Sequence, residues 1–440
     1  MFEGETTVTG TDTGNLARRW SVAHRRSIWT GIAIASAGGA GFGAAVLAGA
    51  SPAFGQPLAT LLGGAGVLAA GLLAYFNGQH SRAQTEAHHK ADMDRERERH
   101  AEDSRRAQVS TLRDRYTAIA AQIADTNSAA IRQAGVYALT ALADDWHAFG
   151  EDDERQVCIN LLQWYLRVPF PVGDDPEKPD LSEREIRQTI VGILTERRRR
   201  PAEHPKSWAT TVISLHQASL PNCVFWGINL ADLHLPDVDL SNAKLAGADL
   251  TNADLHGADL HDADLHDADL RSADLKDAKL AGAKLTGAKL DDAHLFRSIL
   301  VEADLANATL TGAYLNSANL NGAFMYRANL HGADLMKANL TSAQLGFAKL
   351  NGTTLIHTDL TGAYLHVADL NGADLTGAKL LGANLTGADL NGANLHLANL
   401  TGVDLTDAKL DDASFIHAKY DETTQWPEGF APPSPEPNLR

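Results

Sequence analysis

Residues 255–270 read LHGADLHDADLHDADL, in which leucine returns at every fifth position. This register holds without an insertion over 220–420, where 37 of the 41 positions spaced five apart are Leu. The other four are Phe225, Met325, Phe415 and Tyr420. Over 243–418 the position two before each of these residues is Ala in 32 of 36 cases. Because the repeat covers nearly half of the chain, it decides the fold before any local propensity does.

A period of five fits neither regular element. On an α-helix a step of five residues leaves the side chain about 140° from its starting direction, so the leucines would spiral around every side. On a flat strand an odd step places successive leucines on opposite faces. The chain must therefore turn once per repeat, which lets each Leu and its preceding Ala point to a common axis. The remaining positions are rich in Asn, Asp, Gly, Ser and Thr, as tight turns favour, so the pattern predicts a solenoid.

The repeated unit Ala-Asp/Asn-Leu-x-x, as in ADLHG and ANLTG, resembles the pentapeptide-repeat family. The resemblance implies a right-handed quadrilateral β-helix with four pentapeptides in each coil. Ten such coils would form a rod roughly 48 Å long at ~4.8 Å per coil. We expect this β-helix, with its end caps, over 206–430, and a disordered Pro-rich tail over 431–440. The closing cap is expected at 420–430, YDETTQWPEGF, which resembles the closing segment of the family. The opening cap is expected in the atypical early repeats, which contain Cys223, Val224, Phe225, Trp226, Ile228 and Leu233.

The N-terminal part contains two long apolar stretches. Residues 27–50 and 58–76 carry no charge, and each stretch is long enough as a helix to cross a bilayer. We expect a two-helix transmembrane hairpin over 27–77, joined by a tight turn in SPAFGQP, after a cytoplasmic tail over 1–26. Basic residues on both flanks predict a multi-pass cell-membrane protein whose N-terminus and solenoid are cytoplasmic. The alternative is a cleaved signal peptide that ends near Ala50.

Between the hairpin and the repeats the sequence predicts helices. Residues 78–115 are dense in both charges, which indicates a charged helical linker. Residues 116–205 contain amphipathic helices, and the last of them ends in Arg197–Arg200, a cluster that complements the helix dipole. This α-helical region is also similar to a segment of actinobacterial membrane-anchored pentapeptide-repeat proteins. The chain has two cysteines, Cys158 in this region and Cys223 in the early repeats, and both are expected to be reduced core thiols.

Composition and motifs exclude several functions. A net charge of −17 argues against direct nucleic-acid binding. No motif for phosphate binding, zinc hydrolysis, serine catalysis or calcium binding is present, so we expect no enzyme, no catalytic or cofactor-binding residue and no cofactor. The histidines His256, His261 and His266 fall on successive sides of a four-sided coil, and no second histidine lies above or below them. We therefore expect no metal site.

Two surface features remain as candidate sites. Residues 230–277 contain twelve acidic and three basic side chains. We call five of these acidic residues the acidic band: Asp249, Asp254, Asp259, Asp264 and Asp269. Five further residues fall close together when the chain is wound with twenty residues per coil, and we call them the aromatic surface: Phe324, Tyr326, Phe347, Tyr364 and His366. Such exposed neighbours indicate a contact site, although scattered, tolerated aromatics would give the same pattern.

These features support two functions. The first is a non-catalytic, membrane-anchored scaffold that displays an acidic rod in the cytoplasm to an unknown protein partner. The alternative is a DNA mimic that modulates a topoisomerase such as DNA gyrase, as in the quinolone-resistance pentapeptide proteins that the repeats resemble. Association of the chain with further copies of itself stays open.

Overall fold

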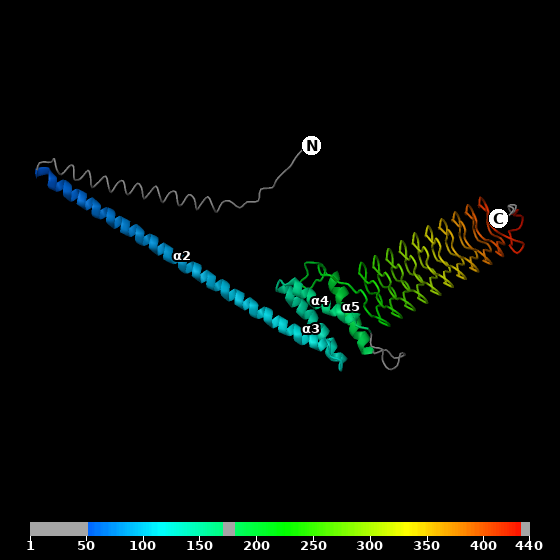
Figure 1. Cartoon of the computed structure of the whole chain (residues 1–440), viewed down its shortest axis with the longest axis horizontal. Coiled ribbons are helices and arrows are strands. Elements are labelled where there is room, and N and C mark those ends of the chain that lie inside the picture. The colour runs from blue at the N-terminus through cyan, green and yellow to red at the C-terminus, as the bar shows by residue number, and fades with distance from the viewer. Residues whose placement is uncertain (1–51, 170–180, 433–440) are drawn as a thin grey trace, which may run out of the picture. The chain divides into compact units, whose positions relative to one another are not determined.

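The computed structural model describes residues 52–169 and 181–432, without the side chains of 52–64 and 181. Within these described residues four helices precede the repeats (Figure 1): α2 (Pro52–Ile123), α3 (Ala129–Ala148), α4 (Asp152–Arg167) and α5 (Leu181–Arg199). By its contacts the chain divides into one unit over 1–106 and a second over 107–440. The α-helical region and the solenoid belong to the second unit.

Helix α2 contains both the charged linker and the second predicted membrane span. Its side chains from 65 to 108 are almost all exposed, and ion pairs three and four residues apart, such as Arg106 with Glu102, connect its charged part. The first predicted span and the tail before it lie outside the described residues. Residues 52–57, predicted as a tight turn, are helical. No helix in the described ranges is both long and apolar enough to traverse a bilayer.

The solenoid is held together by parallel β-bridges, each one residue long, between positions twenty residues apart. The bridges run from Ser214 with His234 to Asn399 with Lys419, and a bridge recurs at every fifth residue. Each coil therefore has twenty residues, four pairing positions and four sides. The predicted pentapeptide-repeat solenoid is confirmed, and its right-handedness stays a prediction.

The corners of each coil are tight turns. The second residue after each inner Leu has a positive φ, between +53° at Asp237 and +69° at Gly287. The following Ala donates its N–H to the inner Leu carbonyl, as from Ala258 to Leu255 at 3.0 Å. A positive φ at the third residue and this hydrogen bond are typical of a type II turn. Gly, Asn and Asp recur at this position because they tolerate the left-handed region.

The interior is a column of the repeated Leu and Ala side chains. From Ala243 to Leu405 these residues are fully or almost fully buried. Where the inner Ala is replaced by a polar residue, its hydroxyl finds a backbone partner. Ser298, Thr353 and Thr358 donate to the carbonyls of Leu295, Leu330 and Leu335 at 2.7, 2.9 and 2.8 Å. The interior therefore leaves these hydroxyls no capacity for chemistry.

The α-helical region packs directly against the start of the solenoid. Helix α3 contacts α4 and α5, and one continuous hydrophobic core runs from Ile119 and Ile123 of α2 through these helices into the first coils. Cys158 and Cys223 are buried, unpaired thiols in this core, as predicted. Burial raises the pKa of each thiol to about 12. Both are therefore protonated and unreactive at neutral pH.

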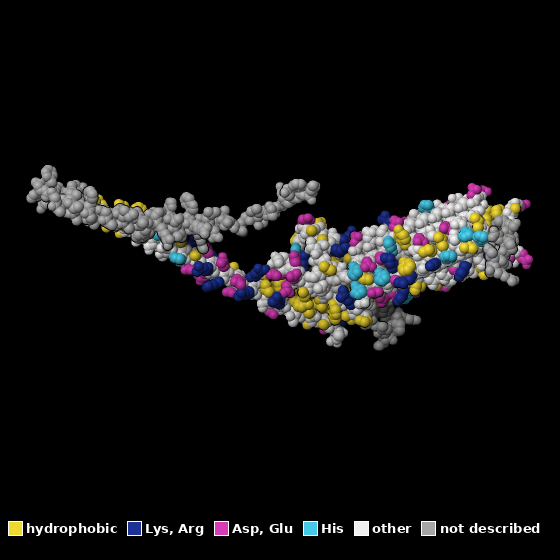
Figure 2. Space-filling view, turned by 45° about the horizontal axis from the view of Figure 1, so that its top comes forward, with side chains coloured by type: hydrophobic (Ala, Val, Ile, Leu, Met, Phe, Trp, Pro, Cys, Tyr) yellow, Lys and Arg dark blue, Asp and Glu magenta, His cyan; other side chains and the backbone are white. Residues whose placement is uncertain are grey.

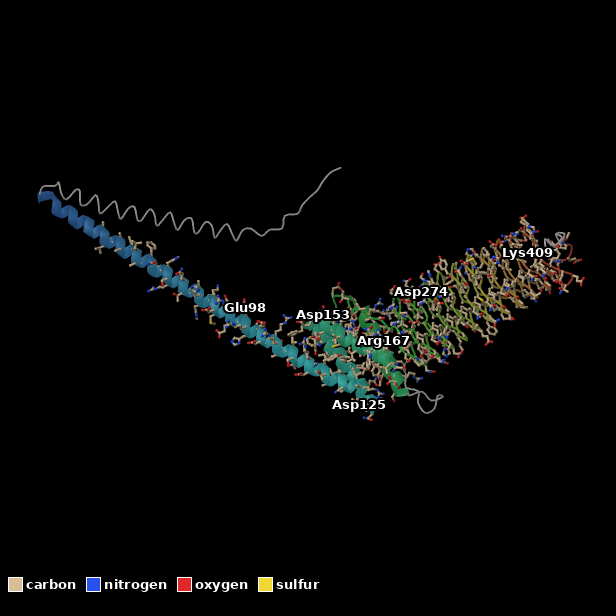
Figure 3. All side chains as sticks on the ribbon, in the orientation of Figure 1. Glu98, Asp125, Asp153, Arg167, Asp274 and Lys409 are labelled. Carbon is tan, nitrogen blue, oxygen red and sulfur yellow. The ribbon has the colours of Figure 1, made fainter. Side chains whose placement is uncertain are left out.

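The first coil has no preceding coil to pair with, and α4 and α5 supply the missing hydrogen bonds. The N–H groups of Ser214 and Ser219 donate to Gln163 Oε1 and to the Leu166 carbonyl, both at 2.7 Å. First-coil carbonyls accept from helix side chains: His216 from Arg167, Ser219 from Arg187, Val224 from Gln188 and Ala231 from Arg198. Figure 3 shows Arg167 where α4 meets this coil.

The opening cap is therefore helical, and its predicted position in the early repeats is wrong. Cys223 to Leu233 belong to the first coil itself, whose bridges continue without interruption. At the other end, Trp426 packs on Phe415, Tyr420 and Phe430 with ring centroids 5.3 to 5.5 Å apart. Both open edges of the solenoid, which would otherwise be free to pair with another chain, are thus covered.

Candidate interaction surface

In residues 255–270 the rings of two of the three histidines bind neighbouring aspartates, whereas His256 donates only its backbone N–H, to Asp254. The Nδ1 atoms of His261 and His266 each lie 2.6 Å from an Oδ1 atom, of Asp259 and Asp264 respectively. Each pair sits on its own side of the coil, because five residues correspond to a quarter of a turn. Among the residues whose side chains are described, no group of three or more His, Cys, Asp or Glu could hold a metal ion.

The acidic band winds around the solenoid. Its first four residues occupy the four sides of one coil. The fifth, Asp269, lies in the next coil and is bridged to Asp249. Asp249 accepts a hydrogen bond from Asn229, and the other four pair with histidine, lysine or arginine side chains: Asp254 with His234, Asp259 with His261 and Lys279, Asp264 with His266, and Asp269 with Arg271. These carboxylates therefore form no continuous acidic face.

The partners of the band also favour its ionised state. A hydrogen bond from the Arg271 guanidinium lowers the pKa of Asp269, against the opposing effect of partial burial. For Asp259 and Asp264, partial burial raises the pKa, but hydrogen bonds from His261 and His266 lower it by more. All three pKa values lie below the ordinary value, so these carboxylates are ionised at neutral pH. They serve as turn and ion-pair partners within the solenoid.

The aromatic surface is brought together by three successive coils. Phe347 lies 5.4 Å from Tyr326 and 5.7 Å from His366 between ring centroids, and Tyr364 lies 5.9 Å from His366. Phe324 shares a bridge column with Tyr364, and Gln344 lies between them. The aromatic rings of Phe324, Tyr326, Phe347 and Tyr364 are 40 to 50 % exposed. Figure 2 shows one side of the molecule, on which hydrophobic and histidine side chains gather over the solenoid.

Gly346 lies between the two tyrosines of this surface. A Cβ atom at this position would lie 3.5 Å from ring atoms of both Tyr326 and Tyr364, which is ordinary contact. A longer side chain would displace the rings. On the other side of Tyr326, the Arg327 guanidinium carbon lies 5.1 Å from its ring centroid and 5.9 Å from that of Phe347. Four of the rings, those of Tyr326, Phe347, His366 and Tyr364, thus form one contiguous cluster with a cation at its edge. Among the described residues Phe324 makes no contact with another ring.

Two apolar residues of this area adopt a strained backbone conformation. Phe347 and Val367 occupy the left-handed turn position in consecutive coils, with φ of 58° and 55°. That region costs a residue with a Cβ roughly 1–2 kcal/mol, and a β-branched residue rarely adopts it. Along the solenoid Leu397 is the other apolar residue at this position. Strain of this kind clusters where function requires a particular side chain.

The α-helical region contains a pocket of about 570 Å³, lined by the end of α2 and by α3, α4 and α5. Its polar wall is a buried network. Glu183 accepts from the Tyr165 hydroxyl at 2.8 Å, from Arg187 Nε at 2.8 Å and from Arg132 at 3.2 Å. Arg187 also donates to the Leu166 and Ser219 carbonyls. Sequence patterns did not indicate this network, which joins the helices to the first coil.

The family described as pentapeptide repeats matches the chain in eight copies, over 234–271, 273–312, 298–336, 338–377, 368–407 and 378–415. HetL, a pentapeptide repeat protein involved in heterocyst differentiation regulation in the cyanobacterium Nostoc sp. strain PCC 7120, is 35% identical; the alignment covers 48% of this chain and 92% of HetL, with a TM-score of 0.36. No curated protein sequence matches the chain.

Two further solved structures are similar. A second pentapeptide repeat protein from Nostoc PCC 7120 is 38% identical over 21% of this chain and 77% of its own length, with a TM-score of 0.21. Full-length QnrB1, a plasmid-mediated fluoroquinolone resistance protein, is 18% identical over 47% of this chain and 94% of its own length, with a TM-score of 0.17.

Proposed function

The chain belongs to the pentapeptide-repeat family, and on that premise we propose that it is a non-catalytic scaffold whose aromatic surface binds another protein. The observation that carries the proposal is the pair of apolar residues, Phe347 and Val367, held in the left-handed turn position beside a cluster of half-exposed rings. Asn or Gly would serve the fold better there, so the fold alone does not account for them. Large, rigid aromatic side chains are the usual anchors of protein interfaces.

The proposal is tested by a variant that should improve the fold and weaken binding. A photoreactive residue in place of Gln344, at the centre of the surface, should capture the partner in cells. We then expect Phe347→Asn/Val367→Asn to leave the free energy of unfolding unchanged or raise it by up to about 1 kcal/mol, because Asn tolerates a positive φ. Affinity for the captured partner should fall about thirtyfold, because interface anchors are lost.

Leu397 provides a matched control. It is apolar, exposed and at the same turn position with φ of 58°, but lies outside the aromatic surface. Leu397→Asn should match the double variant in stability and leave binding unchanged. If the double variant binds as tightly as Leu397→Asn, the aromatic surface is not the binding site.

We further infer that residues 27–77 hold the chain at the cell membrane, with the N-terminus and the solenoid in the cytoplasm. The two apolar stretches and their basic flanks support this placement. So do the exposed large apolar side chains of α2: Val67, Leu68, Leu72, Leu73, Tyr75 and Phe76. Protease added to intact spheroplasts should leave the solenoid uncut and should cut it only after lysis. Digestion in intact spheroplasts would contradict the placement.

The alternative function, a DNA mimic that modulates a topoisomerase such as DNA gyrase, depends on the acidic band. The geometry of the band adds no support to it. Its residues are spread over all four sides of the solenoid, and each is hydrogen-bonded or paired within the chain.

A further inference from the structure

Some of the thirteen cations over 216–420 pair with an aspartate of the preceding coil, whereas two cations beside the aromatic surface have no aspartate there. Five of them bind an aspartate that lies twenty residues earlier, one coil below: Lys279 with Asp259, Lys289 with Asp269, Arg297 with Asp277, Lys379 with Asp359 and Lys409 with Asp389. The residues that lie twenty positions before Arg327 and Lys349 are Asn307 and Asn329, which carry no charge. Within the described part of the chain neither cation forms an ion pair.

The charge of the solenoid also reverses in this area. Residues 324–367, which span the aromatic surface and Val367, contain two acids, Asp334 and Asp359, and three bases, Arg327, Lys337 and Lys349, a net charge of +1. The whole repeat over 216–420 contains 25 acids and 13 bases, a net charge of −12. The aromatic surface thus lies where the rod is locally cationic. The hollow beyond Val367 is lined by Asp369, which is bridged to Lys349, and by the paired Asp389 and Lys409, so the cationic edge is on the side of Arg327.

From this juxtaposition we infer that the aromatic surface binds an acidic peptide segment of its partner, one in which apolar side chains are flanked by carboxylates. This inference rests on the proposed function and names the chemistry of the partner. The apolar side chains contact Phe347, Tyr364 and Val367. The carboxylates contact Arg327 and Lys349, whose charges no side chain of the solenoid neutralises.

A cation beside exposed rings also suits single-stranded nucleic acid, whose bases stack on aromatic side chains. The acidic peptide is favoured because a polyanion would meet only a small cationic area on a rod of net charge −12. A peptide with two or three carboxylates matches the two unpaired cations and leaves the remaining acidic surface in water. The oligonucleotide is therefore an outcome of the test and not a second proposal.

The test compares labelled peptides in which Leu alternates with Asp, with Ser or with Lys, titrated into the full chain. We expect the Leu/Asp peptide to bind about tenfold more tightly than the Leu/Ser peptide, with an advantage that shrinks as salt is added. In Arg327→Gln/Lys349→Gln the advantage should disappear, and the Leu/Ser peptide should bind as before. The matched control is Arg297→Gln/Lys409→Gln. Arg297 occupies the same turn position as Arg327, and Lys409 lies in the same bridge column as Lys349, but both control cations are paired with an aspartate within the solenoid.

Several outcomes would overturn the inference. Equal binding of the Leu/Asp and Leu/Lys peptides, equal effects of the two double variants, or tighter binding of an oligothymidine than of the Leu/Asp peptide would each do so. The proposed function is judged separately, by the captured partner. If Phe347→Asn/Val367→Asn weakens that partner while Arg327→Gln/Lys349→Gln leaves it unchanged, the surface is a binding site but not for an acidic segment.

Discussion

Replacing Glu183 by alanine should lower the free energy of unfolding by about 3–5 kcal/mol, because it leaves a buried arginine without its carboxylate. Glu183 and Arg187 are 5 and 2 % exposed and lie 2.8 Å apart. Arg187 also donates to the Leu166 and Ser219 carbonyls, which belong to α4 and to the first coil. The loss should therefore loosen the junction between the α-helical region and the solenoid as well as α5 itself.

The measurement is urea unfolding followed by tryptophan fluorescence, since Trp146 and Trp208 are buried in the α-helical region. Glu185→Ala is the matched control, because Glu185 lies two residues further on the same helix and is exposed. That change should cost less than about 0.5 kcal/mol. If Glu183→Ala were no more destabilising than Glu185→Ala, the network would not support the cap. Glu183→Gln should fall between them, because the amide keeps an acceptor but not the charge.

The register of the repeats could be predicted from the sequence because it is set by one requirement. Every fifth residue must point inward, and the resemblance to the pentapeptide-repeat family implies that twenty residues close a coil. Phe347 and His366 were therefore expected to meet across adjacent coils, as they do. The same arithmetic separated His256, His261 and His266 onto different sides. It therefore argues against a metal site in a stretch whose composition suggests one.

The caps could not be predicted in this way, because they are not periodic. The cluster Arg197–Arg200 was interpreted as a partner of the helix dipole. In the structure Arg198 instead donates to the carbonyls of Ala231 and Asp232 in the first coil, and Arg197 pairs with Asp144. These contacts depend on how α5 docks on the solenoid, which no local pattern in α5 encodes.

Two neighbours of the aromatic surface, Arg327 and Val367, were not predicted, although the sequence contains a signal for both. A search restricted to aromatic side chains passes over both. The signal was their position, the second residue after an inner Leu, where the chain otherwise places mostly Gly, Asp, Asn and Ser. A bulky side chain at a position that requires a positive φ is a stronger indication of function than an exposed aromatic alone.

A second large effect is expected from one pentapeptide, Ala-Asn-Leu-Thr-Gly, inserted after Gly352. The insertion continues the repeat in register, so the inner Leu and Ala column and the bridges should be kept. It falls between Phe347 and Tyr364, however, and moves Tyr364, His366 and Val367 a quarter of a turn onto the next side of the solenoid. The surface is thereby divided while every side chain is retained, and partner affinity should fall about a hundredfold.

The matched control is the same pentapeptide inserted after Gly392, which lies at the same turn position beyond the surface. Both variants gain identical residues and should unfold at similar temperatures, because each insertion adds one pentapeptide, a quarter of a coil, to the same interior. They differ in whether the three coils of the aromatic surface stay in register.

The affinity of the captured partner for these two insertion variants is the most direct test of the claim that a surface assembled by the twenty-residue register binds a protein. We predict that the Gly392 insertion binds like the unmodified chain and that the Gly352 insertion loses about a hundredfold in affinity. Equal affinity of the two folded variants would contradict the claim.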